Sequence, residues 1–160
     1  MNQYYLFWGG PLSNFAELEL IPYKGELWRT SEHIFMAEKA LHFGDMESYE
    51  KIREAVRPNK AKALGRKVKG FSDEEWDKVK VEKMMLALEA KFSVPVYRDF
   101  LKKTRGQILV EASPWDRIWG IGFDAENALR NKENWGQNLL GKCLLEIRNK
   151  QKLGVNFDEI

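Results

Sequence analysis

The stretch TSEHIFMAEKA, residues 30–40, decides the fold of this chain. Thr30 and Ser31 stand directly before Glu32. This order is typical of a helix start, where a hydroxyl caps free backbone N–H groups and a carboxylate favours the positive end of the helix dipole. Apolar residues then recur with the spacing of one helix face, until a glycine ends the pattern. We therefore predict a helix over residues 31–43.

An acid and an amine share the apolar face of this helix. Glu32 and Lys39 are seven residues apart, so both side chains point almost the same way as Phe35 and Met36. A lysine partly removed from water tends to lose its proton, and a neutral amine attacks aldehydes and imines. A neighbouring carboxylate is able to hold substrate hydroxyls or move a proton. The alternative is a solvated ion pair on one side of the helix, and the spacing alone leaves both open.

Outward from this helix the sequence predicts a small β element before it and further helices after it. Aromatic and alternating residues indicate short strands at 4–8 and 18–21, and a hairpin at 23–28 that turns on Lys24-Gly25. The later helices are expected at 46–56, from Ser72 to about Ser93, at 95–104 and at 139–150, with a brief strand-like run at 108–111. The fold class is therefore mainly α, a compact helical cluster with a small N-terminal antiparallel β element. The length of 160 residues fits one domain over 1–160.

Composition excludes several functional classes. Lys and Arg number 26 against 24 Asp and Glu, which is too balanced for a protein that holds a long duplex by counterion release, although a site for one exposed nucleotide remains compatible. The single Cys143 excludes a disulfide framework, and no metal site is expected from the two histidines. No signal peptide or membrane-spanning run is apparent, so a cytoplasmic protein is expected.

A long irregular segment, residues 112–135, is the second candidate site. It carries Asp116, Trp119, Gly120 and Gly122 within seven residues. Backbone N–H groups near glycines form anion cradles, and a Trp face stacks on a base or a ribose. The alternative is a surface turn whose Trp fills the core. Because long irregular segments in compact domains are usually functional or disordered, we interpret this one as ordered and site-forming.

Three further stretches are candidates, two of them with two interpretations. Gln137 and Asn138 stand where a loop becomes a helix, so they either present N–H groups to a phosphate or form an ordinary helix cap. Asn14, beside Ser13, indicates a turn. The basic run over 59–69 is either a solvated face or lines the entrance for an anionic substrate.

Five motifs, taken in order, resemble the NADAR family of YbiA-like proteins. They are LSNF at 12–15, TSEHIFMAEKA at 30–40, LEAKF at 88–92, LVEASPWDRIWGIG at 109–122 and GQNLLGKCLLEIR at 136–148. The resemblance covers roughly residues 5–150. Two positions depart from the family pattern, because Met36 and Glu38 stand where glutamines are usual.

The resemblance implies a small, mainly helical N-glycosidase that needs no cofactor. Two substrate groups are implied, ribosylamino-pyrimidine phosphates of riboflavin synthesis and ADP-ribose attached to guanine in DNA or RNA. Both contain a C1′–N bond and a phosphate on the ribose 5′ side. The matching positions that carry the reaction are Lys39, Glu32 and Asp116, and those that bind substrate are Asn14, Ser31, Trp119, Gly120, Gly122, Gln137 and Asn138.

Two mechanisms and a non-enzymatic reading stay open at this point. Lys39 would attack an imine at C1′ and hold the sugar as a Schiff base until water releases it. Alternatively Glu32 or Asp116 would stabilise an oxocarbenium-like state while Lys39 binds phosphate. A module that only binds ADP-ribose or a related nucleotide would use the same stacking and phosphate groups. The sequence gives no oligomeric state.

Overall fold

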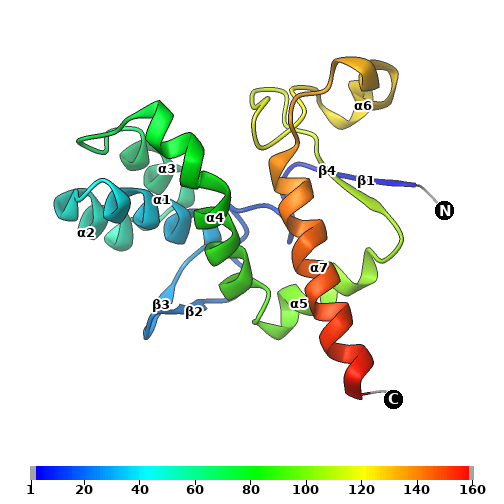
Figure 1. The fold of residues 1–160 in the computed structure, drawn as a ribbon, viewed down its shortest axis with the longest axis horizontal. Helices are drawn as coiled ribbons and strands as arrows, with labels where there is room; N and C mark the ends of the chain where they lie inside the picture. Colours follow the sequence, from blue (N-terminus) through cyan, green and yellow to red (C-terminus); the bar gives the residue numbers. More distant parts are fainter. Residues whose placement is uncertain (1–2, 159–160) are drawn as a thin grey trace. The chain divides into compact units, whose positions relative to one another are not determined.

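The chain folds into two compact units, which are described here one at a time (Figure 1). The structure is a computed structural model that describes the backbone of residues 3–158 and the side chains of residues 3–151. Residues 14–97 form the first unit, called the helical unit below. Residues up to Ser13 together with those from Arg98 onward form the second, called the mixed unit.

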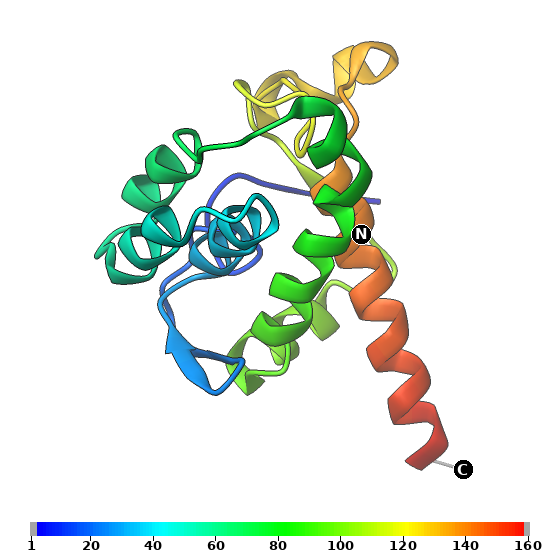
Figure 2. The same cartoon turned by 60° about the vertical axis from the view of Figure 1, so that its left-hand side comes forward.

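The helical unit is built around helix α1. Its elements are β2 (Ile21–Tyr23), β3 (Glu26–Trp28), α1 (Ser31–His42), α2 (Met46–Glu54), α3 (Pro58–Gly65) and α4 (Asp73–Lys91). Helices α2, α3 and α4 all pack on α1, which Figure 2 shows enclosed by them. Every residue of α1 from Ser31 to Glu38 is buried. The predicted buried stripe therefore underestimates the burial of this helix, since nearly its whole circumference is covered.

The ends of α1 follow the sequence signals. The Thr30 hydroxyl accepts a hydrogen bond from the backbone N–H of His33 at 3.1 Å, and Glu32 lies in the first turn. Gly44, just past the C-terminus, has a φ of 72°, a left-handed conformation that favours glycine and stops the helix. The helix therefore starts and stops where local residues dictate.

The predicted hairpin is present. β2 and β3 pair antiparallel, with Ile21 opposite Trp28. Lys24 and Gly25 form the turn with φ values of 51° and 79°, as a two-residue hairpin turn with positive φ requires. The expected strand at 18–21 is absent apart from Ile21, because the backbone N–H of Leu18 donates to the Tyr97 hydroxyl at 2.9 Å instead of to a neighbouring strand.

The mixed unit combines a two-stranded parallel sheet with helices. Its elements are β1 (Tyr4–Phe7), β4 (Ile108–Glu111), α6 (Ala125–Ala128), the 3₁₀ helix η1 (Leu129–Asn134), α7 (Leu139–Asp158) and all but the first residues of α5 (Pro95–Lys103). β1 pairs parallel with β4, with Tyr4 opposite Ile108. The prediction of an antiparallel partner for this strand is wrong, because the pairing joins segments that lie far apart in the chain. One core cluster of the unit consists of small and branched residues, Val110, Ala112, Ile121 and Ala128.

Two segments are more helical than predicted. The basic run forms α3, with Pro58 in the first turn, where proline's missing N–H costs nothing. The irregular segment is interrupted by α6 and η1. Asp124 starts α6, since its carboxylate accepts a hydrogen bond from the backbone N–H of Asn127 at 2.9 Å.

The fold class is confirmed, a mainly helical protein with a small antiparallel β element. That the whole chain behaves as one domain stays a prediction. Among the helices of the described residues, none has the length and apolar character needed to cross a membrane.

Candidate active site

The N-terminus of α1 brings three predicted site residues together in the helical unit. The Ser31 hydroxyl donates to the Asn14 side-chain oxygen at 2.8 Å. The Asn14 carbonyl in turn accepts from the backbone N–H of Glu32 at 3.1 Å. Asn14 and Ser31 are buried, as is Glu32, which is 7% exposed. Asn14 is therefore fixed against the first turn of the helix that carries the predicted acid.

Lys39 lies two turns further along α1, against an aromatic wall. Its Nζ is 4.5 Å from the ring centroid of Phe71 and 5.7 Å from that of Trp76. Phe35 and Phe43 extend the same wall, since both rings pack on Trp76. The amine is partly buried. The wall was not predicted, because Phe71, just before α4, and Trp76, in its first turn, come more than 30 residues later in the sequence.

Burial favours the neutral form of the Lys39 amine. Loss of hydration lowers the pKa of Lys39 below its ordinary 10.5. The carboxylates of Glu32 and Asp73 act in the opposite direction, while Arg66 adds to the lowering. Since desolvation is the largest of these effects, more of the amine is neutral than in an exposed lysine.

The carboxylate of Asp116, in the mixed unit, stabilises the loop that contains it. One carboxylate oxygen accepts hydrogen bonds from the backbone N–H groups of Ile118 at 2.8 Å and Trp119 at 2.9 Å. This arrangement fixes the turn before the partly buried Trp119. A catalytic role for Asp116 stays a prediction, and the geometry gives it a structural one.

The glycine-rich loop and the start of α7 are bonded to each other. The backbone N–H groups of Gly122, Gln137 and Asn138 donate to Ser113, Arg117 and Gly120 carbonyls at 2.8–3.1 Å. A Cβ on Gly120 would lie 2.9 Å from the Glu111 carbonyl oxygen, so this close approach requires glycine. A phosphate at these three N–H groups would have to displace the bonds they already make.

The side chain of Asn138 connects the start of helix α7 to strand β4 by two hydrogen bonds. Its side-chain oxygen accepts from the N–H of Glu111 and its amide nitrogen donates to the Leu109 carbonyl, both at 3.0 Å. Its φ of 51° is left-handed, a conformation that Asn tolerates better than most residues. The sequence did not predict these two contacts, and a role of Asn138 in binding substrate stays a prediction.

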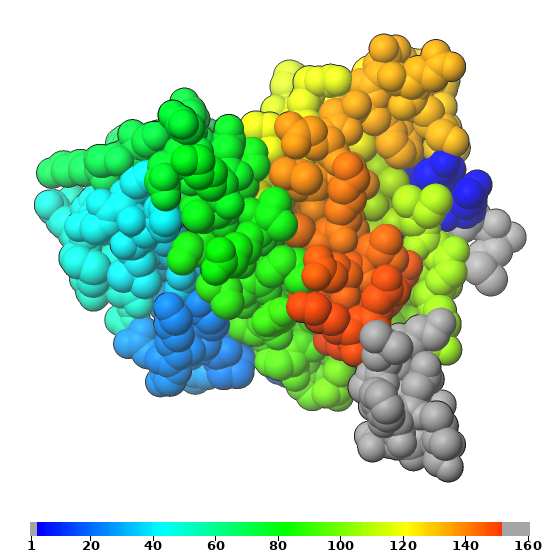
Figure 3. All heavy atoms as spheres, in the orientation of Figure 1, coloured from blue at the N-terminus to red at the C-terminus, as the bar shows by residue number. Residues whose placement is uncertain are grey.

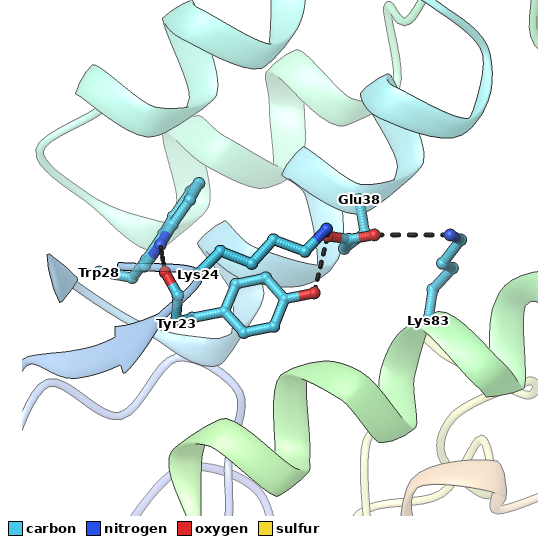
Figure 4. Close-up of polar contacts among 5 residues, drawn as sticks. All are labelled: Tyr23, Lys24, Trp28, Glu38 and Lys83. Atoms are coloured by element: carbon cyan, nitrogen blue, oxygen red, sulfur yellow. Dashed lines mark hydrogen bonds and ion pairs between the residues drawn. The ribbon is translucent and has the colours of Figure 1, made fainter. Parts of the chain in front are cut away.

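A buried carboxylate next to Lys39 was also missed. Glu38 accepts hydrogen bonds from the Tyr23 hydroxyl at 2.7 Å and Lys24 Nζ at 2.8 Å, and Lys83 Nζ lies 3.5 Å from its second oxygen (Figure 4). The Glu38 side chain is only 4% exposed. Burial raises the pKa of Glu38, but its three donors together outweigh this and lower it below the ordinary 4.5. Glu38 thus fastens α1 to the hairpin and to α4.

Comparison with known proteins finds relatives over nearly the whole chain. Residues 6–152 match the NADAR domain. Over 126 residues the chain is 44% identical to N-glycosidase R617 of Acanthamoeba polyphaga mimivirus, covering 77% of this chain and 74% of that protein. Over 153 residues it is 31% identical to the chloroplastic riboflavin biosynthesis protein PYRR of Zea mays, covering 88% of this chain but 23% of that protein.

A solved structure has the same fold. The NMR structure of the E. coli protein YbiA superposes with a TM-score of 0.78 at 32% sequence identity, covering 96% of this chain and 88% of that one.

Proposed function

This chain belongs to the NADAR family, and from that premise we propose that it cleaves the C1′–N bond of a ribosyl 5′-phosphate or ADP-ribosyl adduct. The enzyme class is confirmed at the level of the family, because its relatives are named N-glycosidases, hydrolases that act on N-glycosyl bonds. The substrate and the mechanism are not given by the family's enzyme class, and they are part of the proposal. A cytoplasmic location belongs to the proposal as well.

The observation that carries the proposal is the amine of Lys39. It is partly removed from water, lies against two aromatic rings and shares its helix with the buried Glu32. A protein that only binds a nucleotide has no need for a lysine in this state. An enzyme that attacks an imine carbon requires a neutral amine with a nearby proton carrier.

The proposed reaction uses this amine as a nucleophile. Opening of the ribose ring of a glycosylamine breaks its C1′–O bond and forms a C1′=N imine, while the ring oxygen takes a proton. The lone pair of Lys39 Nζ adds to C1′, and the original amine leaves with the electron pair of its bond and a proton. Water then adds to C1′, the bond to Nζ breaks, and the sugar aldehyde and free Lys39 are restored.

The other site residues have supporting roles in this proposal. Glu32 moves the protons, and Asn14 and Ser31, already bonded to each other, hold ribose hydroxyls. Trp119, in the mixed unit, stays a candidate for stacking on a ring of the substrate. The loop that carries this Trp is held in shape by hydrogen bonds and close packing of five residues, Asp116, Gly120, Gly122, Gln137 and Asn138.

Two substrates fit the proposed chemistry. The relationship to a riboflavin biosynthesis protein supports a ribosylamino-pyrimidine phosphate. ADP-ribosylated guanine in nucleic acid offers the same C1′–N bond with a larger anionic group on the 5′ side.

The test is a parallel assay of the purified chain on both substrates, with release of the sugar measured. Lys39→Met and Glu32→Gln keep side-chain volume and remove the reactive groups, and Lys78→Met, an exposed lysine on α4, is the matched control. We expect the first two variants to lose at least about 100-fold in kcat/KM and the control to keep its activity. Binding of ADP-ribose without release of sugar from either substrate would instead identify a nucleotide-binding module.

A further inference from the structure

The chain that follows helix α3 runs alongside helix α1 in the helical unit. Gly65, the last residue of α3, packs so closely on Met36 that a Cβ would lie 2.0 Å from the Met36 sulfur. Further on, the backbone N–H of Lys69 donates to the Asp45 carboxylate at 2.9 Å. Phe71 then places its ring on the Lys39 amine. Figure 3 shows the segment between α3 and α4 at the surface of this unit (green). These anchors fix residues 65–71 along the flank of α1 that carries Lys39.

Two cations of this region share one flank of α3. Lys62 and Arg66 are four residues apart, so they lie on the same side of the helix, next to its buried stripe of Ala61 and Gly65. Lys62 Nζ is 5.9 Å from the ring centroid of Phe15, which is 37% exposed. Lys60 lies on another side of the helix by the same spacing, and Lys67 follows in the turn after the helix, where it is exposed.

Among the side chains that the structure describes, neither cation is paired with an acid. Over residues 3–151, Lys62 and Arg66 form no ion pair with an Asp or a Glu, whereas Lys69 lies 4.0 Å from Glu47. Arg66 is exposed and Lys62 partly so. The sequence from 57 to 69 has six basic residues and no acidic one, although Lys and Arg outnumber Asp and Glu by only two in the whole chain. The positive charge is concentrated here.

The substrate's phosphate needs such a partner. In the mixed unit the N–H groups of Gly122, Gln137 and Asn138 already have carbonyl acceptors. A guanidinium offers a phosphate two parallel N–H donors, and an ammonium adds a point charge.

We infer that Arg66 and Lys62 form a subsite for the phosphate on the 5′ side of the substrate ribose, beside the reactive Lys39, with Phe15 as an adjoining ring surface. The inference rests on the proposed glycosidase function and adds the group that recognises the anionic end of its substrate. Gly65, the residue before Arg66, packs on Met36, one turn before Lys39 on α1, so the chain holds Arg66 beside the part of α1 that carries Lys39.

The test compares two pairs of basic residues within this segment. The double variant Lys62→Gln/Arg66→Gln removes the subsite, and Lys60→Gln/Lys67→Gln removes the same charge outside it as a matched control. Affinity for ribose 5-phosphate and for ribose is measured by calorimetry or NMR titration. We expect the first variant to bind ribose 5-phosphate about 10- to 100-fold more weakly and the control less than about threefold, with ribose unchanged in both.

Two results would overturn the inference. One is an equal loss of affinity for ribose 5-phosphate in both double variants, which would indicate that the total positive charge of residues 57–69 attracts the phosphate. The other is a wild-type protein that binds ribose 5-phosphate no more tightly than ribose. Failure of the proposed function would give a different result. The wild-type protein would then bind ribose 5-phosphate more tightly than ribose but release no sugar from either glycosylamine substrate.

Discussion

The amine of Lys39 lies 4.5 Å from the centre of the Phe71 ring, and this contact joins the middle of α1 to the residues that precede α4. The ring has two opposing effects. It excludes water, which favours the neutral amine, and its electron-rich face attracts the ammonium form. Desolvation is the largest effect on the pKa of Lys39, and it lowers this pKa below its ordinary value. The reactivity of this lysine therefore depends on its surroundings.

The charges around Lys39 predict how the pH profile will move. Asp73 raises the pKa of Lys39, so Asp73→Asn lowers it further, and the amine becomes neutral at a lower pH. If the neutral amine is the nucleophile, kcat/KM rises with pH through this pKa. We therefore expect the rising limb of the profile to shift to lower pH in Asp73→Asn. The matched control is Asp77→Asn, an exposed acid on the same helix that pairs with Lys80.

A shift in the control as well would point to a general charge effect. No shift in Asp73→Asn would show that the rising limb reports another group, and the nucleophilic role of Lys39 would lose its support.

The Schiff-base route predicts a covalent adduct on one residue. We expect borohydride, added during turnover, to reduce the C1′=Nζ bond and leave a sugar attached to Lys39, detected by peptide mass spectrometry. Lys39→Met is expected to give no adduct, while Glu32→Gln still gives one, formed more slowly. Full turnover without any adduct on the wild-type protein would favour direct hydrolysis through an oxocarbenium-like state.

Local signals account for what could be predicted of this site. Thr30 and Gly44 fix the ends of α1, so the two-turn spacing of Glu32 and Lys39 followed directly from the sequence. The aromatic wall on Lys39 could not be predicted in this way, because Phe71 meets it only after α4 packs on α1. Periodicity identifies the apolar face of a helix but not which distant ring covers it.

The missed features share the same cause. The pairing of Tyr4 with Ile108 joins segments about 100 residues apart, and no property of either strand specifies the other. The hydrogen bonds of the Asn138 side chain to two residues of β4 were not predicted either. Polar side chains near a helix start have several possible partners, and tertiary packing selects among them.

Glu38 is expected to contribute to stability through its three donors. Glu38→Gln keeps the shape but removes the charge that Tyr23, Lys24 and Lys83 contact. We expect the free energy of unfolding at pH 7 to fall by about 1–3 kcal/mol, measured by urea denaturation. Glu82→Gln, an exposed position on α4, is the control and is expected to change it by less than about 0.5 kcal/mol.

The same pair of variants predicts a pH dependence. The pKa of Glu38 is lower in the folded chain than its ordinary 4.5, so the stabilisation is present above that pH. It is lost as the pH falls through the folded pKa, since the carboxylate is then protonated. The stability difference between wild type and Glu38→Gln is therefore expected to shrink below about pH 4.5. A difference that stays constant at lower pH would mean that packing, not charge, is the cause.

Gly65 is required for space, and this predicts a coupling with Met36. A Cβ at position 65 would lie 2.0 Å from the Met36 sulfur and 3.3 Å from its Cβ, which no rotation of the side chain can move. Gly65→Ala would otherwise be favourable in a helix by up to about 1 kcal/mol. We expect it instead to destabilise the chain by about 1–3 kcal/mol in thermal or urea unfolding, because α3 is pushed away from α1.

The matched measurement is the same substitution in a Met36→Ala background. Met36→Ala alone is expected to cost about 2–5 kcal/mol, since it leaves a cavity beside α3. Adding Gly65→Ala then fills part of that cavity, so the double variant is expected to be no less stable than Met36→Ala. If the two losses simply added, Gly65 would be needed for a reason other than contact with Met36. Because this contact also positions Arg66 along α1, the double variant shows in addition whether binding of ribose 5-phosphate depends on how tightly α3 is packed.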